Sequence, residues 1–396
     1  MHRLGYYPTI ITREWTSEIR SHQDTKTPFG NKVRHEVFES YEVFYLPFHP
    51  GILDRAYVAF GESALRPLFL LVKLLDVFLV RFTLRYTSFA NFLPFIKEQF
   101  KAKDFHKAII SGEPFYLFKI GYHIKKNLGL NWIADYRDDW STNELQIERS
   151  GGAVRKWIAQ IEAQYEKQWV GTAQSIVSVS HTYTQRIADF VGKKGITSEN
   201  GYEEELLTLA TPPLYDDFTI TYSGVLYPSQ ELTVIIGALQ LAKEEGIPFY
   251  LKFLGAGFDV KERKRIESLV PSNLLAFVIV TDRRPRNQAL IELQKSHVLL
   301  SIAYGNMKGI PSSKLYEYLA LRKPVLLCPS DHDVMENMIK ESGLGYIADT
   351  SHQCLAAINE IRGLYQDNRI VSISKEALPG VRKYSRQNQM EKLNLS

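Results

Sequence analysis

Two short apolar runs with one helix between them constrain this chain more than any other stretch. The runs His297–Ile302 and Val325–Cys328 each have the length and composition of a buried strand. Between them, Leu315 and Leu319 form an apolar stripe at helical spacing, and an Arg-Lys-Pro sequence ends the helix. A strand, a helix and a second strand in this order predict a parallel sheet covered by helices.

The start of that helix is the predicted ligand site. In a parallel sheet it lies at the carboxyl edge of the strands, where ligands of open α/β sheets bind. Ser312 or Ser313 can cap the helix, and its N–H groups favour an anion such as phosphate. Lys314 and Glu317 share one helix face. They form either a solvated ion pair or a site in which Lys314 holds a diphosphate and Glu317 accepts hydrogen bonds from a ribose.

The segment 309–320 reads Gly-Ile-Pro-Ser-Ser-Lys-Leu-Tyr-Glu-Tyr-Leu-Ala. It resembles the donor-binding signature of GT-B glycosyltransferases of the retaining family 4 type, in the variant Pro-Ser-Lys-x-x-Glu-Tyr. The resemblance implies a donor site that includes Ile310, Pro311, Ser312, Ser313, Lys314 and Glu317, with Glu317 at the ribose. The family's Glu-x7-Glu pattern would place its first Glu at position 309, where this chain has Gly309.

A second motif lies in the N-terminal half. The predicted strand Trp132–Tyr136 runs into Asp-Tyr-Arg-Asp-Asp-Trp, which places carboxylates and a guanidinium at the sheet edge. This segment resembles an Asp-x-Arg-Asp-x-Trp motif of the same group. By that resemblance Arg137 and Asp138 line the acceptor side and join Lys314 as catalytic residues. The alternative is a turn with an Arg–Asp pair on the surface.

Glycines follow two predicted strands of the C-terminal half. Gly224 follows the first strand, and Gly255-Ala-Gly257 follows the second. A single Gly-x-Gly is weak evidence, but the order and spacing match the glycine turns around the donor in the resembled family. The Arg and Lys that often follow the first turn there are absent from 225–230. Either Lys314 or the pair Arg283-Arg284 would then neutralise the diphosphate. The alternative is that these two arginines are exposed loop residues.

A chain of 396 residues exceeds what one hydrophobic core usually organises. The resemblance implies an α/β fold of the GT-B class, with two Rossmann-like domains facing a cleft. We expect the acceptor-side domain at 1–214 and the donor domain at 215–377, with a terminal helix at 378–396 that packs back on the first. Residues 1–5 read as the end of a helix, so the first domain is expected to lack the family's first strand and glycine-rich loop. A natural short N-terminal helix is the alternative.

The stretch 64–82 is the most apolar of the chain, yet Arg66, Lys73, Asp76 and Arg81 interrupt it too often for a helix that spans a bilayer. Further aromatic and basic residues follow as far as Phe100. The segment is either a pair of helices packed on the sheet or a surface that lies against a membrane.

Composition narrows the class of partner. A net charge of +4 argues against nucleic acid, and two cysteines in apolar surroundings suit a reducing cytoplasm. No Cys or His cluster has metal-ligand spacing, so neither a metal nor another cofactor is expected.

The expected function is transfer of a sugar from a nucleotide diphosphate sugar to a cell-surface polysaccharide or lipid-linked glycan. The protein would act in the cytoplasm, peripherally on the inner face of the membrane. The alternatives are a GT-B UDP-sugar epimerase and a non-catalytic nucleotide-sugar-binding protein.

Overall fold

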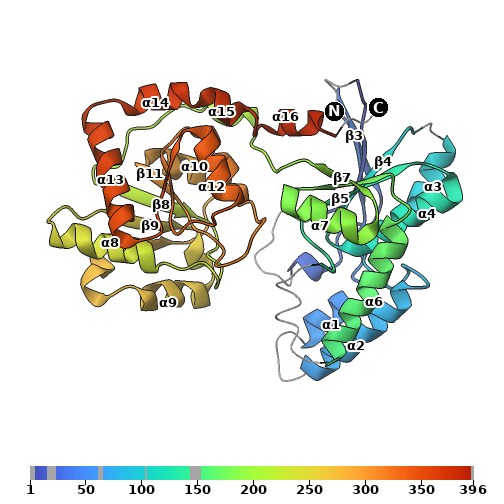
Figure 1. Cartoon of the computed structure of the whole chain (residues 1–396). Helices are drawn as coiled ribbons and strands as arrows, with labels where there is room; N and C mark the ends of the chain where they lie inside the picture. Colours follow the sequence, from blue (N-terminus) through green and yellow to red (C-terminus); the bar gives the residue numbers. More distant parts are fainter. Residues whose placement is uncertain (1–4, 16–23, 61–65, 103–104, 143–152, 394–396) are drawn as a thin grey trace. The chain divides into compact units, whose positions relative to one another are not determined.

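The structure, a computed structural model, describes residues 5–15, 24–60, 66–102, 105–142 and 153–393. The chain forms two compact units, of which the first comprises 1–197 with 393–396 and the second comprises 198–392 (Figure 1). The sequence led us to expect a boundary after 214 and a terminal helix at 378–396 that packs back on the first domain. The compact units instead count 198–214 and 378–392 with the second unit.

The second unit contains a six-stranded parallel sheet in the order β10-β9-β8-β11-β12-β13. Its strands are β8 (Thr219–Ser223), β9 (Tyr250–Leu254), β10 (Val278–Thr281), β11 (Val298–Ser301), β12 (Val325–Leu327) and β13 (Gly345–Ile347). The chain leaves β8 toward one edge of the sheet and later returns to pair β11 with the other side of β8. This is the Rossmann strand order, and ligands bind at the point where it reverses. The α/β prediction for this half is confirmed.

Helices connect these strands. They are α8 (Thr233–Glu244), α9 (Val260–Leu269), α10 (Arg286–Lys295), α11 (Ser313–Ala320), α12 (Val334–Ser342) and α13 (Ser351–Gln366), followed by α14 (Ile370–Glu376), α15 (Leu378–Arg382) and α16 (Arg386–Glu391). The single terminal helix expected from the sequence is therefore replaced by short helices. The isolated bridge between Tyr202 and Ser385 ties the α15–α16 segment to the segment that opens this unit.

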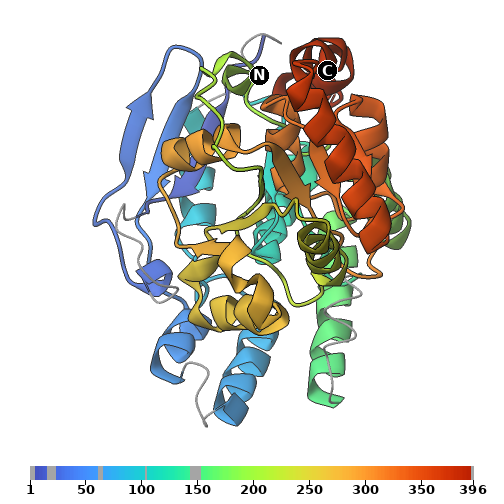
Figure 2. The ribbon, with the colours of Figure 1, turned by 90° about the vertical axis from the view of Figure 1, so that its left-hand side faces the viewer.

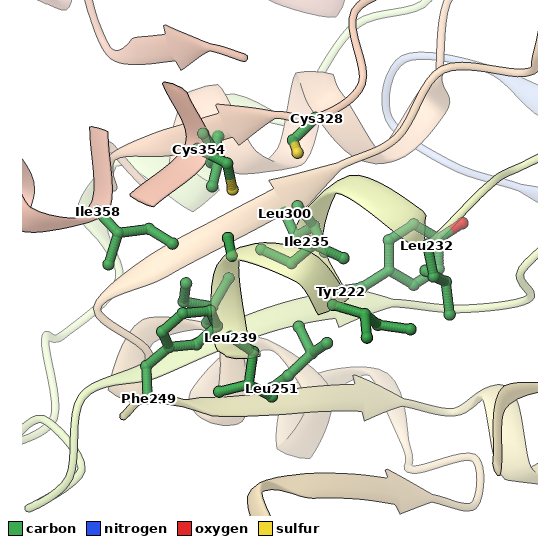
Figure 3. Close-up of a cluster of buried hydrophobic side chains, with 14 of the residues drawn as sticks. Tyr222, Leu232, Ile235, Leu239, Phe249, Leu251, Leu300, Cys328, Cys354 and Ile358 are labelled. Atoms are coloured by element: carbon green, nitrogen blue, oxygen red, sulfur yellow. The ribbon is translucent and has the colours of Figure 1, made fainter. Parts of the chain in front are cut away.

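The core of the second unit lies between the sheet and α8 with α13. Ile235 and Leu239 of α8 meet Leu251 of β9 and Leu300 of β11 in one buried cluster, and Ile358 of α13 joins it (Figure 3). These side chains are at most a few per cent exposed, and burial of each contributes about 1.5–3 kcal/mol. A rigid core of this kind fixes the strand ends that carry the candidate site.

The first unit has two sheets, one in the order β1-β3-β2 and one in the order β4-β5-β6-β7. All pairs are parallel except β2 with β3. The strands are β1 (Thr9–Arg13), β2 (Arg34–Val37), β3 (Glu42–Leu46), β4 (Ala108–Ser111), β5 (Trp132–Tyr136), β6 (Ser175–Ser178) and β7 (Lys194–Thr197). The helices are α1 (Ile52–Phe60), α2 (Arg66–Val80), α3 (Phe92–Ala102), α4 (Phe118–Leu128), α6 (Ala153–Val170) and α7 (His181–Val191).

Neither sheet of the first unit is a complete Rossmann sheet. Ile11 of β1 and Ile110 of β4 pack against the same apolar cluster, although no described strand pairs with both β1 and β4. Among the described strands, β1 and β4 are therefore edge strands of their sheets. The predicted helix end at 1–4 lies outside the described residues.

Most of the apolar segment 64–82 forms α2. Val77 and Val80 are buried in the core, so the prediction of helices packed on the sheet is correct for one face of α2. Within the residues that the structure describes, no helix is long and apolar enough to cross a membrane.

Candidate functional site

The loop between β11 and α11 presents the start of α11 at the carboxyl edge of the sheet. Gly309 has φ +77°, a conformation that favours glycine, and its N–H donates to Asp333 Oδ2 at 2.6 Å. Ile310 is half-buried, whereas Pro311 and Ser312 are buried. Ser312 occupies the N-cap position, but its side chain makes no capping hydrogen bond. The first amides of α11 therefore lack a side-chain acceptor, which is the condition under which a helix start binds an anion.

Lys314 lies in the first turn of α11. Its Nζ donates to the Tyr222 hydroxyl at 2.8 Å and to the Val225 carbonyl at 3.0 Å. Nζ also lies 4.4 Å from the centroid of the Tyr222 ring. Burial lowers the pKa of Lys314 to about 8, and among the described ion pairs none joins Lys314 to a carboxylate. A half-buried ammonium group whose acceptors are all neutral favours an anionic ligand, because the ligand's charge would offset the cost of its desolvation.

The two predicted glycine turns lie beside Lys314. Gly224 and Gly255 both have φ +89°. A Cβ added to Gly224 would lie 2.8 Å from Cε of Lys314. One added to Gly255 would lie 3.8 Å from Cα of Gly224 and 4.0 Å from Cα of Arg283. The structure thus brings Gly224, Gly255, Arg283 and Lys314 together at the ends of β8, β9 and β10.

Gly257 and the side chain of Arg283 border this set. A Cβ on Gly257 would collide with the guanidinium of Arg263 and would lie 3.0 Å from Oδ1 of Asp282. The exposed guanidinium of Arg283 lies over the ring of Phe258, 4.2 Å from its centroid. Stacking of this kind holds a cation in place and leaves its N–H groups available to solvent or a ligand.

A cavity of about 290 Å³ opens on the same face of α11. Ser313, Lys314 and Glu317 form one wall, and the other lining residues are Asn200, Gly201, Tyr202, Glu203, Arg286 and Arg386. Arg286 Nη1 lies 2.6 Å from Glu317 Oε1. Glu317 is therefore paired with Arg286 while Lys314 contacts Tyr222, so the solvated Lys314–Glu317 pair is not the arrangement that forms. Sequence reasoning missed Arg286 and Arg386, since no local pattern connects them to α11.

Tyr318 attaches α11 to the end of β8. Its buried hydroxyl accepts a hydrogen bond from the backbone N–H of Ser223 at 2.8 Å, directly before Gly224. Burial raises the pKa of Tyr318 well above its usual value. The Tyr of the Glu-Tyr pair in the signature therefore fixes the distance between Lys314 and the first glycine turn. Tyr222 and Tyr318 were both missed as site residues.

The Tyr318→Phe substitution is expected to lower the free energy of unfolding by about 1–3 kcal/mol, because it leaves the buried N–H of Ser223 without its acceptor. Urea denaturation measures the difference. Tyr316→Phe is a matched control on the same helix, since Tyr316 is equally buried and its hydroxyl has no hydrogen-bond partner among the described residues. Equal losses in the two variants would contradict the role given to the Tyr318 hydroxyl.

The Asp-x-Arg-Asp-x-Trp motif lies in the first unit, after β5. Asp135 is buried, and its Oδ2 accepts hydrogen bonds from Ser111 Oγ at 2.5 Å and from Arg137 Nε at 3.1 Å. Asp138 is exposed and hydrogen-bonded to Glu113, whose pKa is raised first by burial and then by Asp138. Glu113 has φ 72°, a strained conformation for this residue. The motif therefore contributes to two pairs: an ion pair between Arg137 and Asp135, and a hydrogen-bonded carboxyl pair between Asp138 and Glu113. Glu113 was not predicted from the sequence.

No protein-family model matches the chain, and no curated protein matches it by sequence. Solved structures do share its fold. Sucrose-phosphate synthase (tll1590) from Thermosynechococcus elongatus superposes with a TM-score of 0.61 over 99% of this chain and 88% of its own, at 14% identity. Anabaena Alr3699/HepE in complex with UDP-glucose superposes with a TM-score of 0.55 over 97% of this chain and 99% of its own, at 11% identity. TarM superposes with a TM-score of 0.53 over 78% of this chain and 58% of its own, at 15% identity. The fold is therefore that of GT-B glycosyltransferases.

Proposed function

We propose that this protein is a glycosyltransferase that takes a sugar from a nucleotide diphosphate sugar, with retention of configuration at the anomeric carbon. The observation that carries the proposal is the half-buried Lys314. It has no carboxylate partner among the described ion pairs and lies beside two glycine turns, at a helix start whose N-cap side chain makes no capping hydrogen bond. Backbone amides, a lysine and glycines that allow close approach together suit a diphosphate. The fold shared with sucrose-phosphate synthase and HepE supports the same class.

In the proposed reaction the diphosphate departs from the anomeric carbon, and negative charge develops on its oxygens. Lys314 and the first amides of α11 would stabilise that charge without reorganising, which is the largest contribution a protein usually makes to such a step. No metal or other cofactor is part of this proposal. Arg283 would reach the same oxygens from the end of β10.

The cavity would hold the nucleoside. Glu317 would accept hydrogen bonds from the ribose hydroxyls, with Arg286 orienting its carboxylate at 2.6 Å. HepE was solved in complex with UDP-glucose, which supports uridine as the first base to test. We propose Arg137 and Asp138 as the acceptor-side residues, with a polysaccharide or lipid-linked glycan as acceptor. The two buried free cysteines support a cytoplasmic site of action.

Calorimetric titration with UDP- and GDP-sugars tests the donor site. Glu317→Ala is expected to weaken binding of the preferred donor about 10-fold or more, because hydrogen bonds from the ribose to a carboxylate contribute about 1.5–3 kcal/mol. Glu341→Ala is the control, since Glu341 is ion-paired with Lys383 and does not line the cavity. Failure of the wild type to bind any of these donors would overturn the proposal.

Product analysis separates the candidate reactions. A transferase releases nucleoside diphosphate and forms a glycoside only when an acceptor is present. An epimerase would convert the donor sugar without one, and a binding protein would retain the donor unchanged. The backbone of Gly309 has φ +77°, a conformation that disfavours the glutamate of the family pattern at this position. This departure from the pattern is the reason to test the binding-protein alternative.

A further inference from the structure

One face of α2 presents large apolar side chains to solvent. Leu68, Leu71, Leu75 and Phe78 are 41%, 62%, 49% and 56% exposed. At about 100° per residue they fall within a sector of about 80° on the helix. Phe82, which is 66% exposed, follows directly after the helix and packs edge to face on Phe78. The stripe is therefore continuous along the whole helix and does not belong to the core that holds Val77 and Val80.

Two neighbouring helices also expose apolar side chains. α1 packs on α2 and exposes Val58, whereas α6 contacts α2 and exposes Val154 and Trp157. Figures 1 and 2 show that α1, α2 and α6 extend beyond the strands of their unit. We refer to the exposed side chains of these three helices as the apolar helical face.

The charges on these helices are sorted by sign. The acidic side chains point away from solvent: Asp54, Asp76 and Glu166 are buried, and Glu162 is half-buried. The exposed charged side chains that the structure describes on the three helices are all basic, namely Arg55, Lys156 and Lys167. Arg81 and Arg85 are also exposed, on either side of Phe82. Among the described residues of these three helices, the apolar side chains thus share the solvent-exposed surface with basic charges, which makes this surface complementary to a negatively charged apolar partner.

We propose that the apolar helical face docks on a bilayer that contains anionic lipid. Amphipathic helices bind such surfaces by burying apolar side chains at the acyl boundary while Lys and Arg contact the headgroups. A second copy of this chain fits less well, because a two-fold contact brings the same basic rim against itself. The stripe of one 15-residue helix is also small beside the roughly 800 Å² per partner of a standard protein interface. This proposal does not depend on the donor site.

Co-sedimentation tests the proposal, with vesicles of phosphatidylcholine alone or mixed with phosphatidylglycerol. We expect the wild type to bind the mixed vesicles at low salt and to dissociate as salt rises, because screening weakens the contacts of the basic residues. The variant Leu71→Ser/Leu75→Ser/Phe78→Ser should reduce the bound fraction about tenfold, since three buried apolar side chains are lost. Lys156→Gln/Lys167→Gln should reduce it less and should weaken the dependence on salt.

Val260→Ser/Leu269→Ser/Ile291→Ser is the matched control, because these side chains are as exposed but lie on the second unit. It should bind as the wild type does. Circular dichroism checks that each variant is folded, which is expected because all eight substituted positions are exposed. The proposal is overturned if the wild type stays in the supernatant with mixed vesicles at low salt, or if the first variant binds unchanged. A concentration-dependent dimer that the first variant dissociates would also overturn it.

Discussion

Lys314→Met is expected to weaken the binding of a nucleotide diphosphate about 10- to 100-fold and to lower kcat/KM further, by about 100-fold or more. The larger effect on turnover follows because the charge on the departing diphosphate grows in the transition state, so the lysine contributes more there than in the ground state. Methionine fills nearly the same volume, which keeps packing against Tyr222. Calorimetry with UDP and steady-state kinetics measure the two effects.

The matched control is Lys323→Met. Lys323 lies beyond the other end of α11, is 7% exposed, and has a pKa that burial lowers to about 8, as for Lys314. Its replacement should leave UDP binding unchanged. In the wild type, affinity should fall as the pH rises above about 8, because Lys314 loses its charge there. That fall should persist in Lys323→Met and disappear in Lys314→Met. A flat profile in the wild type would contradict this role of Lys314.

Gly224→Ala is expected to reduce UDP affinity about 10-fold and to lower the free energy of unfolding by about 1–3 kcal/mol. The new Cβ would lie 2.8 Å from Cε of Lys314, so it would push the ammonium away from Tyr222 and Val225. Alanine is also strained at φ +89°. Urea denaturation and calorimetry measure the two effects.

Gly246→Ala separates the strain from the collision. Gly246 follows α8 at φ +76°, and nothing lies within 4 Å of the position of its Cβ. This variant should share the loss of stability and keep the affinity of the wild type. If both variants bind UDP equally well, the collision with Lys314 does not matter and the glycine is needed only for the turn.

Much of the fold could be predicted from the sequence, because short apolar runs that alternate with amphipathic stretches are local patterns. The strands around α11 and the glycines after β8 and β9 lie where that pattern placed them. The motif 309–320 also predicted which end of the helix faces the carboxyl edge. Gly224, Gly255, Arg283 and Lys314 come together because the parallel register aligns the strand ends, which sequence reasoning anticipates.

The partners of these residues could not be predicted in the same way. Arg286 pairs with Glu317 and Tyr318 accepts from Ser223, and each pair joins elements that are adjacent only after folding. Glu113 was missed because a Glu-Pro step after a strand reads as an ordinary turn, whereas its importance lies in the contact with Asp138. The two faces of α2 also could not be separated, since apolar residues occupy most positions on both the buried and the exposed face of this helix.

The edge strands β1 and β4 have a consequence for the protein in concentrated solution. Each edge carries backbone groups that no described strand pairs, and Ile10 and Ile109 beside them are 42% and 38% exposed. Unpaired apolar edges act as templates for strands of other molecules, because an added strand satisfies their hydrogen bonds. Intermolecular pairing at either edge would bring strands of separate molecules together, so exposed apolar edges of this kind favour association at high protein concentration.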